Sequence, residues 1–144
     1  MVPSKPERPT LQREAAMLAR GKERIIQSGD WLTKRELSEL LDLDEAGLEL
    51  VDEWKRTGQI FTIHHADIEY YPVYALEDAA AHRLRAGMAE AIAILATKKD
   101  GWGMAFWFGS SNSYLGGRLP KDVLKDLPGK VLDAAQDEIS GIHY

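Results

Sequence analysis

The chain has 144 residues, a net charge of −5 at pH 7 and no cysteine. Its length suits one domain or two small subdomains that share a core, and the lack of cysteine excludes disulfides and thiolate metal sites. The longest apolar stretch, residues 91–96, is far shorter than the roughly 20 residues that cross a bilayer. The first ten residues contain three prolines and no apolar run, so we expect no signal peptide and a cytoplasmic protein.

The first 30 residues predict an unstructured arm and one helix. Residues 1–10 are proline-rich and polar, and they would bury too little apolar surface to offset the entropy of ordering. Across residues 11–30, Thr10 can cap a helix that ends near Gly29, since glycine suits the left-handed backbone that closes helices. Apolar residues recur there at helical spacing: Leu11, Ala15, Leu18, Ile25 and Ile26.

Charge is divided unevenly along the chain. Residues 1–35 carry a net charge of +4, whereas residues 36–144 carry −9. A basic N-terminal arm could meet an anionic partner, although a solvated, charged helix accounts for such a run more often.

Residues 31–76 predict two short helices and a hairpin. Thr33 and Glu36 have the spacing of a capping box for a helix over 34–41, which would bury three leucines, Leu37, Leu40 and Leu41. Asp44 can cap a second helix that ends at Thr57-Gly58 and carries its apolar stripe on Leu48, Val51 and Trp54. Two short helices joined by a tight turn are typical of a helix-turn-helix.

The hairpin would follow these helices as a wing. Residues 59–63 and 68–71 are rich in β-branched and aromatic residues, and residues 64–67 break the run. Pro72 would end the second strand, because proline cannot donate a ladder hydrogen bond.

Residues 77–144 predict a helical domain, although residues 75–85 show no clear periodicity. Residues 102–108 are apolar on nearly every side and fit either a buried strand or a short buried helix; the flanking glycines favour the helix. Pro120 and Pro128 suit the first positions of two further helices. The sequence thus predicts a mainly α protein, a winged helix-turn-helix with a small β-hairpin followed by a C-terminal helical domain. Its four tryptophans lie in apolar stripes and are expected in the core: Trp31, Trp54, Trp102 and Trp107.

No pattern indicates catalysis. His64 and His65 are adjacent, so in a strand they would point to opposite faces, and His82 and His143 are far away in sequence. We therefore expect no metal site. The glycine clusters do not match a phosphate-binding loop, and the carboxylates fall at solvent positions of the predicted helices. We expect a protein that is not an enzyme and holds no cofactor.

The predicted second helix of the helix-turn-helix is acidic. Residues 44–56 hold five acids and two bases, and acids in that position repel phosphates. This disfavours DNA binding through this helix and favours a helix-turn-helix that serves as a structural platform. The cations that could still contact DNA lie at the start of one helix and the end of the other: Lys34, Arg35, Lys55 and Arg56.

The loop over residues 112–120 differs in kind from the other connections. It combines apolar Tyr114 and Leu115, the pair Gly116-Gly117, and Arg118, a bidentate donor for carboxylate or phosphate. Such a loop is a reasonable recognition element. It is equally well explained as a tight connector in which Leu115 plugs the core and Arg118 pairs with a local acid.

A wider pattern surrounds this loop. An aromatic-rich short helix precedes it, and the loop reads Asn112-x-x-Leu115-Gly116-Gly117-Arg118-x-Pro120, followed by Asp122-Val123-Leu124 and a last helix with Val131-Leu132. This segment, residues 101–132, resembles the C-terminal toxin-binding domain of the Xre/MbcA/ParS antitoxins. Ser113 stands where the family typically has proline. The upstream part is similar to stand-alone members with a helix-turn-helix ahead of that domain.

The resemblance implies an antitoxin. Members neutralise RES-domain toxins, which consume NAD, by direct binding; they often bind their own promoter, and they self-associate as homodimers or higher oligomers. It implies a partner-binding surface at the loop: Asn112, Tyr114, Leu115, Gly116, Gly117, Arg118 and Pro120. The alternative is a DNA-binding transcriptional regulator without a toxin partner. No membrane partner is expected.

Overall fold

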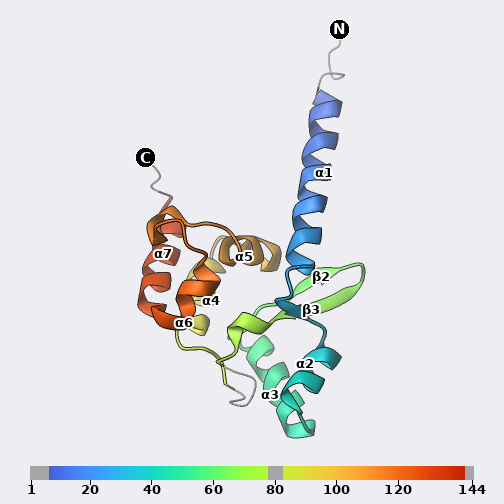
Figure 1. Cartoon of the computed structure of the whole chain (residues 1–144), viewed down its shortest axis with the longest axis vertical. Helices are drawn as coiled ribbons and strands as arrows, with labels where there is room; N and C mark the ends of the chain where they lie inside the picture. Colours follow the sequence, from blue (N-terminus) through green and yellow to red (C-terminus); the bar gives the residue numbers. More distant parts are fainter. Residues whose placement is uncertain (1–6, 78–82, 142–144) are drawn as a thin grey trace.

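The computed structural model describes residues 7–77 and 83–141. In this part of the chain, helices dominate and a small antiparallel sheet joins them (Figure 1). The mainly α prediction is thus confirmed in outline. The elements in chain order are α1 (Glu7–Ile26), β1 (Trp31–Leu32), α2 (Lys34–Leu41), α3 (Glu45–Arg56), β2 (Ile63–His65), β3 (Ile68–Pro72), the 3₁₀ turn η1 (Val73–Ala75), α4 (Met88–Leu95), α5 (Gly101–Phe108), the 3₁₀ turn η2 (Ser113–Leu115), α6 (Pro120–Asp126) and α7 (Pro128–Ser140).

Helix α1 begins at Glu7, so the prediction of an unstructured arm through residue 10 is wrong for its last four residues. Pro9 lies in the first turn, where a backbone N–H has no helical partner and proline costs little. Residues 1–6 lie outside the described residues. The helix stands clear of the rest of the molecule over most of its length (Figure 1), and the chain turns after it at Gly29, whose φ is +90°.

The predicted caps of α2 and α3 are confirmed. The Thr33 hydroxyl accepts from the Glu36 N–H while the Glu36 carboxylate accepts from the Thr33 N–H, and the Asp44 side chain accepts from the Gly47 N–H. Leu37 and Leu41 are buried, but Leu40 is 49% exposed and its predicted burial is wrong. A residue is rotated by about 100° from its helical neighbour, so a face centred on Leu37 and Leu41 leaves Leu40 at its edge.

The sheet has the strand order β1-β3-β2. Within the hairpin, Ile63 pairs with Tyr70 and His65 with Ile68, so the turn is Ala66-Asp67 alone; both residues have positive φ, as a two-residue type I′ turn requires. The predicted strand over 59–63 is wrong except at its last residue. The N–H groups of Gln59 and Ile60 both donate to the Trp54 carbonyl and extend the end of α3 instead. Pro72 ends β3 as predicted.

Strand β1 was not predicted. Trp31 and Leu32 pair with Pro72 and Tyr71 at the edge of the sheet. The Val73 N–H also donates to the Asp30 carbonyl. These bonds tie the segment between α1 and α2 to the end of the hairpin.

The C-terminal half is helical, and residues 102–108 are a helix as predicted. Asp100 caps α5 by accepting from the Gly103 N–H. Helix α4 packs against α7, which also contacts α6 and the turn η2. The ambiguous stretch 75–85 contains the end of η1 and an isolated bridge between Leu76 and Leu84; residues 78–82 lie outside the described residues.

One aromatic cluster joins the two halves of the chain. Phe108 of α5 stacks on Phe61 at a centroid distance of 5.9 Å and lies 5.5 Å from Tyr74; Trp31 meets Phe61 edge-on at 5.7 Å. The expected burial of the tryptophans is confirmed for Trp31, Trp54 and Trp107, which are at most 7% exposed, whereas Trp102 is only partly buried. The described buried residues form a single core.

None of the helices in the described ranges is long and apolar enough to cross a bilayer.

Candidate functional site

The loop from Asn112 to Pro120 connects α5 to α6 and is closed by its own hydrogen bonds. The Asn112 side chain accepts from the Tyr114 N–H at 2.9 Å, and the Asn112 carbonyl accepts from the Gly117 N–H at 2.8 Å. The Asn112 N–H donates to the Arg118 carbonyl at 3.0 Å and closes the loop across its base. Asn112 therefore serves mainly as the internal brace of the loop.

The two glycines serve the backbone conformation of this loop. Gly116 has a φ of +69° and Gly117 a φ of +88°, the left-handed region that side chains disfavour. A Cβ added to either residue would meet no atom within 4 Å. The backbone conformation therefore requires glycine here, and the close approach of another group does not.

Leu115 and Pro120 anchor the loop in the core. Leu115 is 9% exposed and the ring of Pro120 is fully buried. The turn η2, which carries Leu115, lies against α7. Of the predicted partner-binding set, Pro120 is thus closed to a partner in this conformation, and Leu115 exposes only a small part of its side chain.

Tyr114 and Arg118 are placed on the surface. Tyr114 is 53% exposed, and the Arg118 side chain is exposed as well. No carboxylate of the described residues forms an ion pair with Arg118. Of the connector explanation, the burial of Leu115 in the core is therefore confirmed, whereas the pairing of Arg118 with a local acid is not seen among the described residues.

A groove runs beside the exposed side of the loop. It has a volume of about 260 Å³ and combines two cations, two exposed apolar side chains and no acid. We call it the basic groove, and its lining is Tyr114, Leu115, Gly116, Arg118, Val123, Leu127 and Lys130. Leu127, 43% exposed, and Lys130 were missed from the sequence. They come from the junction of α6 and α7, which only the fold brings beside the loop.

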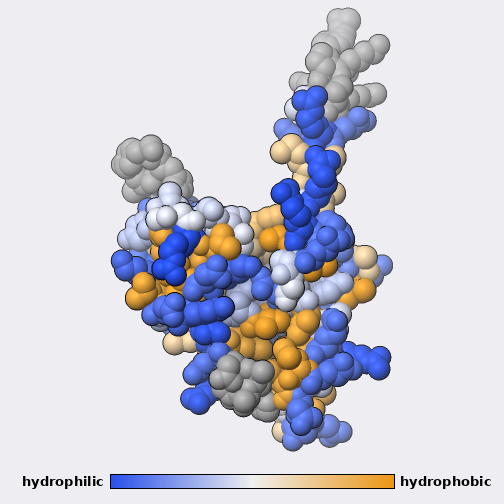
Figure 2. All heavy atoms as spheres, viewed as in Figure 1, coloured by the Kyte–Doolittle hydropathy of each residue, from blue (hydrophilic) through white to orange (hydrophobic). Residues whose placement is uncertain are grey.

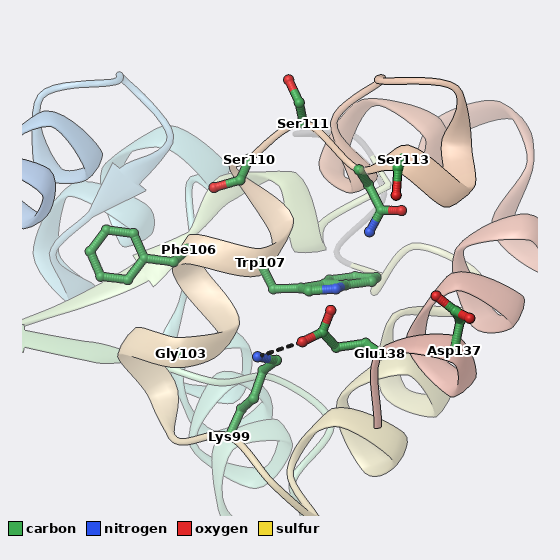
Figure 3. A pocket seen from close by; sticks show the side chains of 10 residues that line it. Lys99, Gly103, Phe106, Trp107, Ser110, Ser111, Ser113, Asp137 and Glu138 are labelled. Carbon is green, nitrogen blue, oxygen red and sulfur yellow. Dashed lines mark ion pairs between the residues drawn. The ribbon is translucent and has the colours of Figure 1, made fainter. Parts of the chain in front are cut away.

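A second hollow includes Asn112 in its lining. This tryptophan pocket has a volume of about 470 Å³ and is lined by α5, the start of the loop and the end of α7 (Figure 3). The Trp107 ring lies between Ser113 and Glu138, and Glu138 pairs with Lys99 at 3.1 Å. Trp107 Nε1 is buried without a hydrogen-bond partner among the described residues. From the sequence, Trp107 is expected in the core and belongs to the aromatic-rich helix of the resemblance, but it is not among the predicted site residues.

The four candidate DNA-binding cations are each paired with a nearby acid. Lys34 lies 2.6 Å from Asp52, Lys55 2.5 Å from Glu69, Arg56 2.6 Å from Glu53, and Arg35 3.6 Å from Glu39. A phosphate would have to displace these carboxylates. Exposed ion pairs are weak, but the acids remain beside the cations and oppose an anion.

Glu69 of β3 is the most connected of these acids. It accepts hydrogen bonds from Thr62 and from the Tyr71 hydroxyl, and it pairs with Lys55 of α3. Partial burial acts to raise the pKa of Glu69, but the hydrogen bonds from Lys55, Thr62 and Tyr71 outweigh it and lower that pKa. This group is a structural link between α3 and the sheet.

The two adjacent histidines lie on opposite sides of β2, as predicted for neighbours in a strand. His64 Nε2 lies 3.5 Å from Glu69, whereas His65 Nε2 lies 3.2 Å from Glu23 of α1. His82 and His143 lie outside the described residues. Among residues 7–77 and 83–141, no three His, Asp or Glu side chains gather where they could share a metal ion.

No protein-family model, no curated protein and no solved structure matches the chain.

Proposed function

We propose that this protein is the antitoxin of a bacterial type II toxin–antitoxin system, and that it neutralises a RES-type, NAD-consuming toxin in the cytoplasm by direct binding. It acts by occupying the toxin, without catalysis or a cofactor of its own. The proposal rests on the resemblance of residues 101–132 to the toxin-binding domain of the Xre/MbcA/ParS antitoxins and on the geometry of the loop.

The observation that carries the proposal is that some parts of the loop fix its shape while other side chains remain exposed on it. Internal hydrogen bonds and the buried Leu115 fix its shape, while Tyr114 and Arg118 remain exposed on it. A connector would need only the first of these properties. A rigid loop that presents an aromatic ring and an unpaired guanidinium loses little entropy on binding and offers two side-chain types enriched at protein interfaces.

The basic groove indicates what the toxin presents to this surface. Arg118 and Lys130 supply two positive charges without a lining acid, and Tyr114 and Leu127 supply apolar area. A toxin segment that carries a carboxylate next to an apolar side chain fits this combination, because a carboxylate can accept two hydrogen bonds from one guanidinium.

Co-expression tests the proposal. We expect the product of the neighbouring reading frame to arrest growth and deplete NAD when expressed alone, and to co-purify with this protein without arrest when both are expressed. A neighbouring product that is harmless alone, or that does not co-purify, would contradict the proposal.

A second function is favoured by the arrangement of α2, α3 and the β2–β3 hairpin. We propose that these elements form a winged helix-turn-helix, which supports promoter binding or, without a toxin, a role as transcriptional regulator. The acids paired with Lys34, Arg35, Lys55 and Arg56 weigh against it. A gel shift on the upstream region of the gene tests it: binding that weakens steeply with salt is expected of a DNA reader, and no shift at low salt removes this function.

A further inference from the structure

The tryptophan pocket has the dimensions of a small-molecule site. Its volume of about 470 Å³ falls within the range of ligand pockets in proteins. It lies between α5 and the end of α7, and residues 110–113 line it on the side of the loop (Figure 3). It shares no lining residue with the basic groove, so it is a separate site from the groove proposed to meet the toxin.

The pocket contains a hydrogen-bond donor that the described chain leaves unused. Trp107 is 7% exposed, and its Nε1 atom is buried without a partner among the described residues. In Figure 3 the indole ring is seen nearly edge-on, with its nitrogen close to the carboxylate of Glu138. A buried N–H without a partner is unfavourable, so an acceptor atom of a ligand that reaches this nitrogen is bound more tightly.

The side chains beside this nitrogen can make way for a ligand. Glu138 pairs with Lys99 at 3.1 Å, but both side chains remain partly exposed, at 32% and 24%. Ion pairs in contact with solvent are weak, so this pair rearranges at little cost. A shift of the Glu138 side chain opens the approach to Trp107 Nε1 and leaves the carboxylate free to accept a hydrogen bond from the same ligand.

The rest of the lining is polar but mainly uncharged. The side-chain oxygen of Asn112 accepts from the Tyr114 N–H, which leaves the amide hydrogens of Asn112 as donors. Asp137 is exposed and forms no ion pair among the described residues. Three hydroxyls complete the polar lining: Ser110, Ser111 and Ser113. On the face that Figure 2 shows, the C-terminal half has mainly hydrophilic or intermediate colours, and an apolar ligand does not fit such a surface.

We propose that the tryptophan pocket binds a small, neutral molecule with several hydroxyl groups, of the sugar class. A hydroxyl both donates and accepts, so this one type of group can accept from Trp107 and Asn112 and donate to the carboxylates at the end of α7. Lys99 and Glu138 offset each other, and the single remaining charge, on Asp137, repels an anion. Phe106 adds an apolar part to the lining, which suits the C–H face of a sugar ring.

Heteronuclear NMR of the full-length chain tests the proposal without any toxin. The four tryptophans give four indole N–H signals, and the signal that is missing from W107F belongs to Trp107. We expect at least one of three neutral sugars, D-glucose, D-ribose and maltose, to shift that signal at millimolar concentrations while the other indole signals stay in place. Succinate and putrescine, which are small charged molecules, should leave all four signals unchanged.

Two pairs of variants locate the site. W107F should weaken sugar binding by roughly 3- to 10-fold, the effect of one lost hydrogen bond, whereas W54F, which alters an equally buried tryptophan of α3, should bind as the wild type does. D137A should also weaken binding, and D133A, on the exposed surface of α7 one turn earlier, should not. Far-UV circular dichroism checks that all four variants fold.

Three results would overturn the proposal. One is the absence of any shift with all three sugars, and another is tighter binding of succinate or putrescine than of the sugars. The third is an unchanged sugar affinity in both W107F and D137A, which would show that the sugar binds outside the tryptophan pocket.

Discussion

Tyr71 and Tyr74 lie three residues apart, and their hydroxyl groups have different surroundings. The Tyr71 hydroxyl donates to Glu69 at 3.3 Å, whereas the Tyr74 hydroxyl is buried with no hydrogen-bond partner among the described residues. Burial raises the pKa of both phenols, with a smaller contribution from Glu69 at Tyr71 and from Asp30 at Tyr74. A buried polar group without a partner costs about 1–3 kcal/mol.

We therefore predict that Y74F raises the free energy of unfolding by about 1 kcal/mol, because it removes an unpaired buried hydroxyl. Y71F is the matched control and should lower it by about 1 kcal/mol, because it removes a hydrogen bond to a carboxylate. Urea denaturation at neutral pH measures both. A loss of stability in Y74F as large as in Y71F would show that the Tyr74 hydroxyl is satisfied in solution.

The loop glycines lead to a second prediction at the residue scale. G117A places a side chain on a backbone with a φ of +88° and should cost about 1–2 kcal/mol. G129A, in the first turn of α7 where an added Cβ meets nothing within 4 Å, should instead stabilise by up to about 1 kcal/mol. Thermal unfolding of the two variants separates these effects, and equal shifts in Tm would refute the role assigned to the left-handed backbone.

At the scale of the elements, Glu69 links α3 to the sheet through Lys55, Thr62 and Tyr71. The hydrogen bonds that lower its pKa in the folded state are absent in the unfolded chain. A lowered folded pKa stabilises the protein above the unfolded pKa, and this stability is lost as the pH falls through the folded pKa.

We predict that the free energy of unfolding falls as the pH is lowered below about 4.5, and that E69Q shows a shallower fall. E39Q is a control on the exposed surface of α2, where Glu39 meets only Arg35 at 3.6 Å. Denaturation at a series of pH values provides the measurement. If the free energy of unfolding of E69Q and of the wild type depended on pH in the same way, Glu69 would not have this structural role.

The elements predicted best from the sequence are those whose ends are fixed by residues close by in the chain. Thr33 and Asp44 cap their helices by hydrogen bonds within four residues, and Pro120 begins α6 where a missing N–H costs nothing. Strand β1 escaped prediction because two residues carry no periodicity, and its partners are about 40 positions away in the chain. The first strand of the hairpin was misplaced because Gln59 and Ile60 bond back to α3, whereas the second strand over 68–71 was predicted correctly.

The candidate site was also predicted in part. The loop was recognised because Gly116, Gly117 and Arg118 are contiguous in sequence. Local chemistry did not distinguish a connector from a recognition element, since that choice depends on whether Arg118 meets an acid in three dimensions. Leu127 and Lys130 escaped notice because the fold, and no sequence motif, brings the junction of α6 and α7 beside the loop.

At the scale of the whole molecule, a single core supports the candidate loop. Phe61, Tyr74 and Phe108 join the N-terminal and C-terminal halves, so the loop between α5 and α6 is held on a rigid base. Helix α1 extends beyond that base (Figure 1).

The central claim is that the loop at 112–120 binds the proposed toxin. Titration calorimetry tests it most directly, by measuring the affinity of the wild-type chain and two arginine variants for that toxin. We predict that R118A weakens binding of the RES-type toxin by at least 10-fold without lowering Tm, because Arg118 is exposed and meets no acid of the described chain; a loss of about 1.4 kcal/mol corresponds to that factor. R35A, whose side chain is 90% exposed on α2, should bind as the wild type does. Unchanged affinity in R118A together with a lower Tm would contradict the claim and make the loop a connector.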